Sequence, residues 1–238
     1  MTPDMARIMQ AVEATWPPAR AWDVGPFRVR DGQGGGQRVS AATAEGVVTE
    51  PELRAAEQAI QGLGQTPLFQ CRGEGSALEQ LLQDHGYTPR DETVIYAAPI
   101  TALTDKAIPR VTAFPIWEPL AIMKDIWATD GIGPSRLAVM HRAACKSGIL
   151  GRWNEKPAGA AFVGVHQHIA MVHGLVVLPE QRRQGMADWL MRAAAHWAAG
   201  QGAAWMAVLC VAANAPANGL YQSLGFAPVG RYHYRIKA

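Results

Sequence analysis

The segment from Met171 to Ala199 constrains the fold of this chain most, because it joins an apolar run, a glycine turn and an amphipathic stretch. The apolar run ends at Leu178-Pro179, and a short basic turn leads to Gly185. From Met186 onward, apolar side chains recur at the spacing of a helix with one buried face. The sequence therefore predicts a strand, a tight turn and the N-terminus of a helix, in that order.

The predicted turn has the chemistry of an anion site. The N-terminus of a helix presents unpaired N–H groups and a partial positive charge, which favour a phosphate. Gly185 allows a phosphate to approach the backbone, and Arg182 and Arg183 add positive charge beside it. We therefore expect this turn to bind a phosphate-bearing ligand.

Two sequence blocks resemble the motifs of a known family. Arg182-x-x-Gly185-x-Ala187 after a strand resembles the acetyl-CoA-binding motif of the GNAT superfamily of N-acetyltransferases, Gln/Arg-x-x-Gly-x-Gly/Ala. The block from Asn214 to Phe226, Asn-x-x-Ala-x-x-Leu-Tyr-x-x-Leu-Gly-Phe, follows the apolar strand 205–211 as the family's C-terminal motif does. The resemblance is specific over residues 159–234. It implies an α/β fold in which helices flank a central, mixed, twisted sheet.

The resemblance also implies a ligand and the residues that bind it. The co-substrate would be acetyl-CoA, with its phosphates on the turn and its pantetheine arm paired to the preceding strand like an added strand. The thioester carbonyl is then expected to meet the main-chain N–H of Val176 or Val177. The residues implied in binding acetyl-CoA are Leu175, Val176, Val177, Arg182, Arg183, Gln184, Gly185, Met186, Ala187, Asn214 and Tyr221.

Tyr221 is the candidate general acid, because a phenol keeps its proton at pH 7 and can give it to a thiolate leaving group. An isolated tyrosine at this spacing would be interpreted as a core residue, but its motif favours the catalytic role. Asn214 is expected to cap the helix that carries Tyr221. His173 is the candidate general base, since it shares a strand face with Leu175. The alternative is a histidine whose hydrogen bonds are satisfied within the core.

The acceptor is expected to be a primary amine on a small or amino-acid-like molecule. Two helices, over 117–127 and 135–145, precede the sheet strands and are joined by a flexible connection. Helices in this position line the acceptor pocket in the family. The resemblance therefore places Trp117, Trp127, Asp130 and Ser135 near the substrate. For the two tryptophans, burial in the core is the alternative.

The N-terminal half resembles the C-terminal half. The segment Leu81–Tyr87 is similar to Leu220–Phe226, and Cys210 follows Cys71 at the same offset of 139 positions. We interpret residues 1–100 as a degenerate GNAT-like half, 101–115 as a linker and 116–238 as the catalytic domain. An N-terminal extension of unrelated fold is the alternative. The position of Arg182 is occupied by a threonine in the first half, where the nearby Glu45 disfavours a phosphate.

The sequence of the first half also predicts its own helices and strands. The run Gly34–Gly36 is interpreted as a hairpin tip rather than a phosphate loop, because we expect no helix to follow it. Thr49 and Glu52 have the spacing of a capping box. The expected helices are 3–16, 51–61 and 76–85, and the expected strands are 27–30, 38–43, 68–71 and 93–98.

Composition limits the class of protein. An apolar share of 49%, a charged share of 18% and a net charge of +2 are typical of a globular protein and disfavour a nucleic-acid surface. No apolar run reaches the roughly 18 residues that span a bilayer, and charges near the N-terminus disfavour a signal peptide. Three widely spaced cysteines indicate reduced thiols, a cytoplasmic location and no zinc site. We expect a monomer or homodimer. The alternatives are a non-catalytic acyl-CoA-binding regulatory module and an acyltransferase with another acyl donor.

Overall fold

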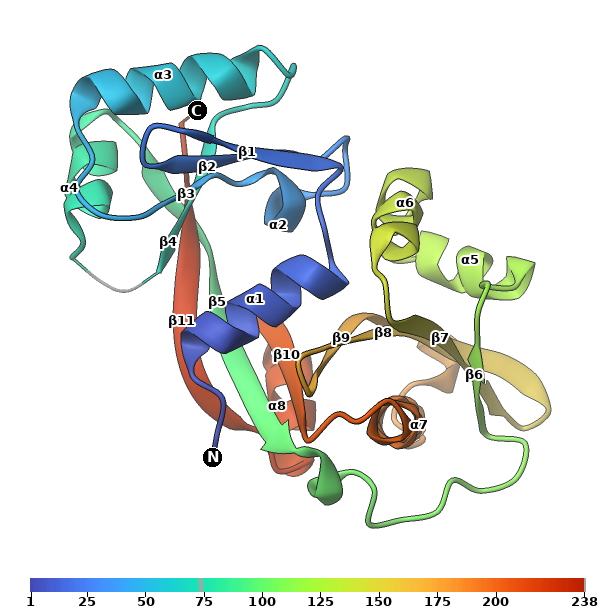
Figure 1. Ribbon diagram of the computed structural model, residues 1–238. Helices are drawn as coiled ribbons and strands as arrows, with labels where there is room; N and C mark the ends of the chain where they lie inside the picture. The colour runs from blue at the N-terminus through green and yellow to red at the C-terminus, as the bar shows by residue number, and fades with distance from the viewer. Residues whose placement is uncertain (73–74, 238) are drawn as a thin grey trace. The chain divides into compact units, whose positions relative to one another are not determined.

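The computed structural model describes residues 1–72 and 75–237 (Figure 1). The chain forms two compact units. The first unit comprises residues 1–17, 95–210 and 214–229, and the second comprises 18–94, 211–213 and residues from 230 onward. Each unit therefore contains segments from both halves of the chain.

The sheet of the first unit is mixed, as expected. Its strands follow the order β5-β10-β9-β8-β7-β6. The four strands β6 to β9 form an antiparallel meander, and β10 pairs with β9 in parallel. The strands are β5 (Thr88–Pro99), β6 (Ala113–Ile116), β7 (Lys146–Trp153), β8 (Lys156–His166), β9 (Ile169–Val177) and β10 (Trp205–Val211).

Helices cover both faces of this sheet. Figure 1 shows α7 (Met186–Gly200) on one side of β7 to β9, with α1 (Met5–Thr15), α5 (Ala121–Ala128) and α6 (Pro134–Arg142) on the other. A β-carbon on Gly151 would lie 2.5 Å from Met186 Sδ, and one on Gly159 would lie 2.9 Å from Leu190 Cδ1. The absence of a β-carbon at both positions therefore lets the side chains of α7 lie directly against the strands. The helix α8 (Ala215–Ser223) follows β10.

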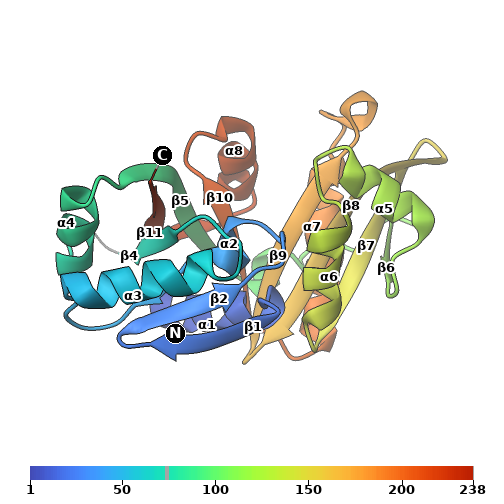
Figure 2. The same cartoon turned by 90° about the horizontal axis from the view of Figure 1, so that it is seen from above.

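The second unit has a smaller core of its own. The strands β1 (Arg20–Val24), β2 (Phe27–Asp31) and β3 (Thr43–Ala44) form an antiparallel sheet, and β4 (Leu68–Arg72) pairs antiparallel with the end of β11 (Ala227–Ile236). The helices are α2 (Gln37–Ser40), α3 (Glu50–Gln61) and α4 (Ala77–Asp84). The largest core side chains are Phe27, Leu53, Ile60, Phe69, Leu82 and Tyr87. Figure 2 shows α3 and α4 seen from above.

Two local expectations for this unit are wrong. The segment 38–43 is not a return strand, because Gly36 (φ +98°) turns the chain into the single helical turn α2, and only Thr43 and Ala44 pair with β2. A helix therefore does follow the glycine run, although its four residues are too few for an anion site. The strand β1 was not predicted; it pairs with β2 across a turn at Gly25 (φ +56°). By contrast, the capping box of α3 is confirmed, since Glu52 Oε2 accepts from the Thr49 N–H at 2.8 Å.

The observed division of the chain differs from the expected one. The units separate within β5, between residues 94 and 95, and within β11, between 229 and 230, rather than at 101–115. The segment 1–17 belongs to the first unit because α1 packs against β8 and β9. Residues 230 onward belong to the second unit because the end of β11 pairs with β4. Helix packing and strand pairing between segments distant in sequence therefore set the division.

In the second unit, the end of β11 is held to α4 by a largely buried carboxylate. Arg235 donates to Glu79 Oε1 at 2.7 Å, and His233 Nε2 lies 3.0 Å from the same oxygen. The Glu79 side chain is 16% exposed, and the hydrogen bond from Arg235 lowers the pKa of its carboxyl group. Because the folded pKa lies below the unfolded one, the stabilisation is complete above the unfolded pKa and is lost as the pH falls through the folded pKa.

We therefore expect Glu79→Gln to lower the free energy of unfolding at pH 7 by about 2 kcal/mol. The difference from the wild type should shrink as the pH falls through the lowered pKa of Glu79, where the native carboxyl group also becomes protonated. Urea unfolding followed between pH 3 and 7 measures both effects. Glu50→Gln is the matched control: it removes an exposed pair with Arg54 and should leave the midpoint nearly unchanged. A pH-independent difference would contradict the role of the Glu79 charge.

Among the residues that the structure describes, no helix is long and apolar enough to cross a bilayer.

Candidate functional site

The strands β9 and β10 separate toward their C-terminal ends. Their parallel ladder joins Ile169–Val172 to Trp205–Val208, whereas β9 continues to Val177 and β10 to Val211. The second half of β9 therefore has an edge that is not paired with β10. A strand edge of this kind can pair with an extended ligand through main-chain hydrogen bonds.

A bulge begins where the two strands part. Gly174 adopts φ +55°, and the register between β8 and β9 shifts between Ala160 and Phe162. The indole Nε1–H of Trp127, on α5, donates to the Gly174 carbonyl oxygen at 2.8 Å. A β-carbon at this position would lie 3.2 Å from Ile132 Cδ1 and 3.4 Å from Met140 Cε. The chain from α5 to α6 thus packs directly on the bulge, which requires glycine.

The basic turn follows β9 as predicted. A 3₁₀ turn at Pro179–Gln181 leads to exposed Arg182 and Arg183, and Gly185 (φ +80°) is the N-cap residue of α7. A β-carbon on Gly185 would meet no heavy atom of the described chain within 4 Å, so its backbone faces open space. Arg182 Nε donates to the Val177 carbonyl oxygen at 3.1 Å, which holds this side chain against the end of β9. The turn therefore offers uncapped N–H groups and two cationic side chains to an anion.

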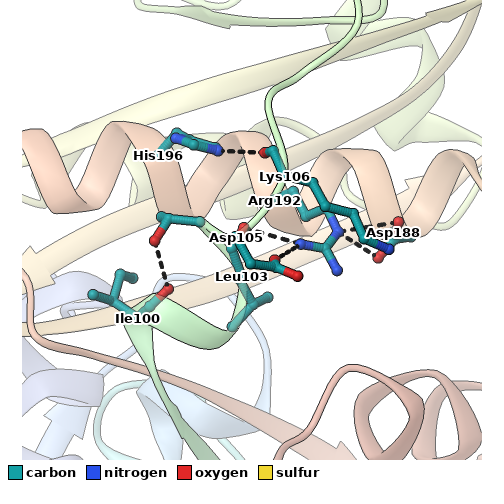
Figure 3. A network of polar contacts seen from close by, with 8 residues as sticks. Ile100, Leu103, Asp105, Lys106, Asp188, Arg192 and His196 are labelled. Carbon is teal, nitrogen blue, oxygen red and sulfur yellow. Dashed lines mark hydrogen bonds and ion pairs between the residues drawn. The ribbon is translucent and has the colours of Figure 1, made fainter.

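An acidic residue in the first turn of α7 is neutralised within the first unit. Arg192 Nε donates to both carboxylate oxygens of Asp188, at 3.0 and 3.2 Å. Figure 3 shows that the same guanidinium group, 6% exposed, also binds Asp105 and the Leu103 carbonyl, and it lowers the pKa of Asp105. His196 contacts the Lys106 carbonyl at 2.8 Å. These contacts fix the segment before β6 on α7 and offset the charge of Asp188 near the anion turn.

The helix α8 presents the predicted tyrosine in an aromatic cluster. Asn214 Oδ1 accepts from the Ala217 N–H at 3.2 Å, which confirms Asn214 as its cap. Tyr221 is 8% exposed, and its ring centroid lies 6.1 Å from that of Tyr96 and 5.9 Å from that of Phe226. The ring is therefore held by packing on β5 and α8.

His173 lies in the core of the first unit. It is 4% exposed, its ring lies 4.9 Å from that of Trp16, and its Nε2 is 2.9 Å from Thr15 Oγ1. The Thr15 hydroxyl also donates to the Ala11 carbonyl oxygen at 2.7 Å, which holds it on α1. Because the bulge at Gly174 interrupts the strand's alternation, His173 and Leu175 do not share a face as expected. The geometry favours the core interpretation.

The residues expected to line the acceptor pocket differ in burial. Trp127 is fully buried and offers no surface to a substrate, whereas Asp130 is exposed in the connection between α5 and α6. Trp117 is half-buried, with Lys146 Nζ 5.1 Å from its ring centroid. Sequence reasoning missed the bulge, although an isolated glycine within a strand pattern is its usual signal.

Within residues 1–72 and 75–237, no group of three or more His, Cys, Asp or Glu side chains is placed to hold a metal ion.

Comparison with known proteins finds a family that is similar to part of the chain. A profile described as the acetyltransferase (GNAT) family matches residues 117–226, which include the bulge, the glycine turn and α8. This part of the chain is similar to the GNAT family of acetyltransferases. This family uses acetyl-CoA.

Relatives extend over the whole chain. The chain is 24% identical over 244 residues to YobR of Bacillus subtilis (strain 168), named as an uncharacterized N-acetyltransferase, and the match covers 98% of this chain and 99% of YobR. A GCN5-related N-acetyltransferase structure from Kribbella flavida has a TM-score of 0.75 at 19% identity, with 99% of this chain and 96% of that one covered. A tandem GNAT protein from the clavulanic acid biosynthesis pathway has a TM-score of 0.57 at 13% identity, covering 88% and 76%. These structures share the GNAT fold.

Proposed function

We propose that this protein transfers an acetyl group from acetyl-CoA directly to a primary amine of a small or amino-acid-like acceptor. The observation that carries the proposal is that the unpaired edge of β9 leads along the chain to Gly185, where the N-terminus of α7 has no side-chain cap. The turn, with Arg182 and Arg183, suits the phosphates, and the backbone of 175–177 suits the pantetheine arm. When bound, acetyl-CoA supplies the acyl group as a reactive thioester.

The residues of the chain have separate roles in this proposal. The N–H of Val176 or Val177 polarises the acyl carbonyl, and Tyr221 donates a proton to the leaving thiolate. His173 Nε2 lies within hydrogen-bond distance of Thr15 Oγ1, at 2.9 Å. Because the ring is buried, a role for His173 as the base requires water to carry the amine proton to it.

We further propose that the second unit derives from a duplication and has lost the residues that bind acetyl-CoA and transfer its acyl group. Elements recur at the offset of 139 positions, since β4 corresponds to β10 and α4 to α8. Two pairs of glycines also recur with the same backbone conformation: Gly46 and Gly185 have φ of +79° and +80°, and Gly86 and Gly225 both have +82°. The first copy lacks the arginine of the turn and carries Glu45 beside it. The second unit then acts as a scaffold.

A binding and turnover experiment tests the proposed function. Calorimetry with CoA measures binding, and release of free thiol from acetyl-CoA is followed over a panel of amines, amino acids and buffer alone. Binding with amine-dependent thiol release supports the proposal. Binding without release would favour a regulatory acyl-CoA-binding module, and release only from longer acyl donors would favour another acyltransferase. Failure to bind CoA would overturn the proposal.

A further inference from the structure

The bulge in β9 is held by a side chain from outside the sheet. The register between β8 and β9 passes from His173 opposite Phe162 to Val176 opposite Ala160, so β9 has two residues where β8 has one. Gly174 lies in the gap between these two pairs. Its carbonyl oxygen accepts from Trp127 Nε1 at 2.8 Å, from the last turn of α5. The indole N–H of Trp127 therefore binds the Gly174 carbonyl oxygen at the point where the regular pairing of β8 and β9 is interrupted.

This hydrogen bond also sets the direction of the next amide. The peptide that joins Gly174 to Leu175 is a rigid plane in which the carbonyl oxygen and the N–H point to opposite sides. With the oxygen held toward α5 by Trp127, the Leu175 N–H points away from α5. Because glycine reaches more backbone conformations than other residues, the contact with Trp127 restricts the orientation of this peptide.

We propose that Trp127 is a positioning residue for acyl transfer, which orients the peptide 174–175 so that the Leu175 N–H polarises the thioester carbonyl. This inference rests on the proposed acetyltransferase function. It shifts the polarising group from Val176 or Val177 to Leu175. It also explains why a fully buried tryptophan directs its only polar atom at the bulge. Preorganised donors of this kind act on the transition state more than on the bound ground state.

Trp127→Phe tests the inference, because it keeps an aromatic ring and removes the donor. We expect kcat to fall between about 10-fold and 100-fold, with the KM for acetyl-CoA and the Kd for CoA within about 2-fold of the wild type. Trp16→Phe is the matched control. Trp16 is 6% exposed and packs on His173, next to the bulge, but the described structure gives its indole no hydrogen bond to β9. We expect Trp16→Phe to lower the melting temperature about as much as Trp127→Phe does, with a much smaller change in kcat.

The outcomes separate this inference from the function on which it rests. Equal falls of kcat in both variants, or a rise of KM without a fall of kcat in Trp127→Phe, would assign Trp127 a merely structural role. A crystal structure of the variant with CoA gives a second readout that needs no turnover: a rotated 174–175 peptide supports the inference, and an unchanged one overturns it. A wild-type protein that binds CoA but transfers no acetyl group would overturn the proposed function, and the crystal structure would then decide the positioning role alone.

Discussion

Replacement of Tyr221 by phenylalanine is expected to lower kcat by about 100-fold or more, while the Kd for CoA changes little. The substitution removes only the hydroxyl group, because the ring stays packed against Tyr96 and Phe226. Without a proton donor, the sulfur must leave as a thiolate, which raises the barrier of the transfer step but not the free energy of binding. Steady-state thiol release and calorimetry with CoA measure the two quantities.

Tyr96→Phe provides the matched control for this experiment. It removes the same atom from the neighbouring ring, whose hydroxyl donates to Asn218 Oδ1 at 3.0 Å. This variant should lose stability through the broken hydrogen bond, but its kcat should stay near that of the wild type. An unchanged kcat in Tyr221→Phe would remove Tyr221 from the mechanism. Comparable losses in both variants would show that the cluster is needed as a structure rather than Tyr221 as an acid.

The parts of the site that were predictable from sequence depend on local signals. The succession of β9, the basic turn and α7 follows from an apolar run, Gly185 and helical spacing within thirty consecutive residues. The caps formed by Asn214 and by Thr49 with Glu52 are local in the same way, because their partners lie three residues away. Backbone conformation and nearest hydrogen-bond partners are therefore sufficient to specify these features.

The parts that were not predictable depend on contacts between distant residues. His173 is buried because Thr15 and Trp16, about 160 positions earlier, pack on it from α1. Trp127 reaches the bulge across 47 positions. The pairing of β4 with β11, which decides where the units divide, joins segments that no local pattern connects. A histidine on a strand and a tryptophan on a helix carry no signal of the partner that will cover them, so their roles become readable only from the fold.

The anion turn gives the second large effect that we expect: Gly185→Ala should raise the Kd for CoA at least about 10-fold, equivalent to about 1.4 kcal/mol. Alanine is strained at φ +80°, and its methyl group would occupy the open side of the turn where a phosphate would approach. Relaxation of that strain would also turn the first N–H groups of α7 away from the anion. Calorimetry at fixed ionic strength measures the effect, since charged contacts weaken with salt.

The chain contains its own control for this substitution. Gly46 has φ +79° and also has no heavy atom of the described chain within 4 Å of an added β-carbon. It lies before the N-cap Thr49 of α3, whereas Gly185 is itself the N-cap residue of α7. Gly46→Ala should therefore cost a similar amount of stability, about 1 kcal/mol, through the same strain. Because Thr43 and Ala44 occupy the positions of Arg182 and Arg183, and Glu45 adds a negative charge beside Gly46, this variant should leave the Kd for CoA unchanged. Weaker CoA binding in Gly46→Ala, with normal binding in Gly185→Ala, would move the phosphate site to the second unit and contradict the assignment of the turn after β9.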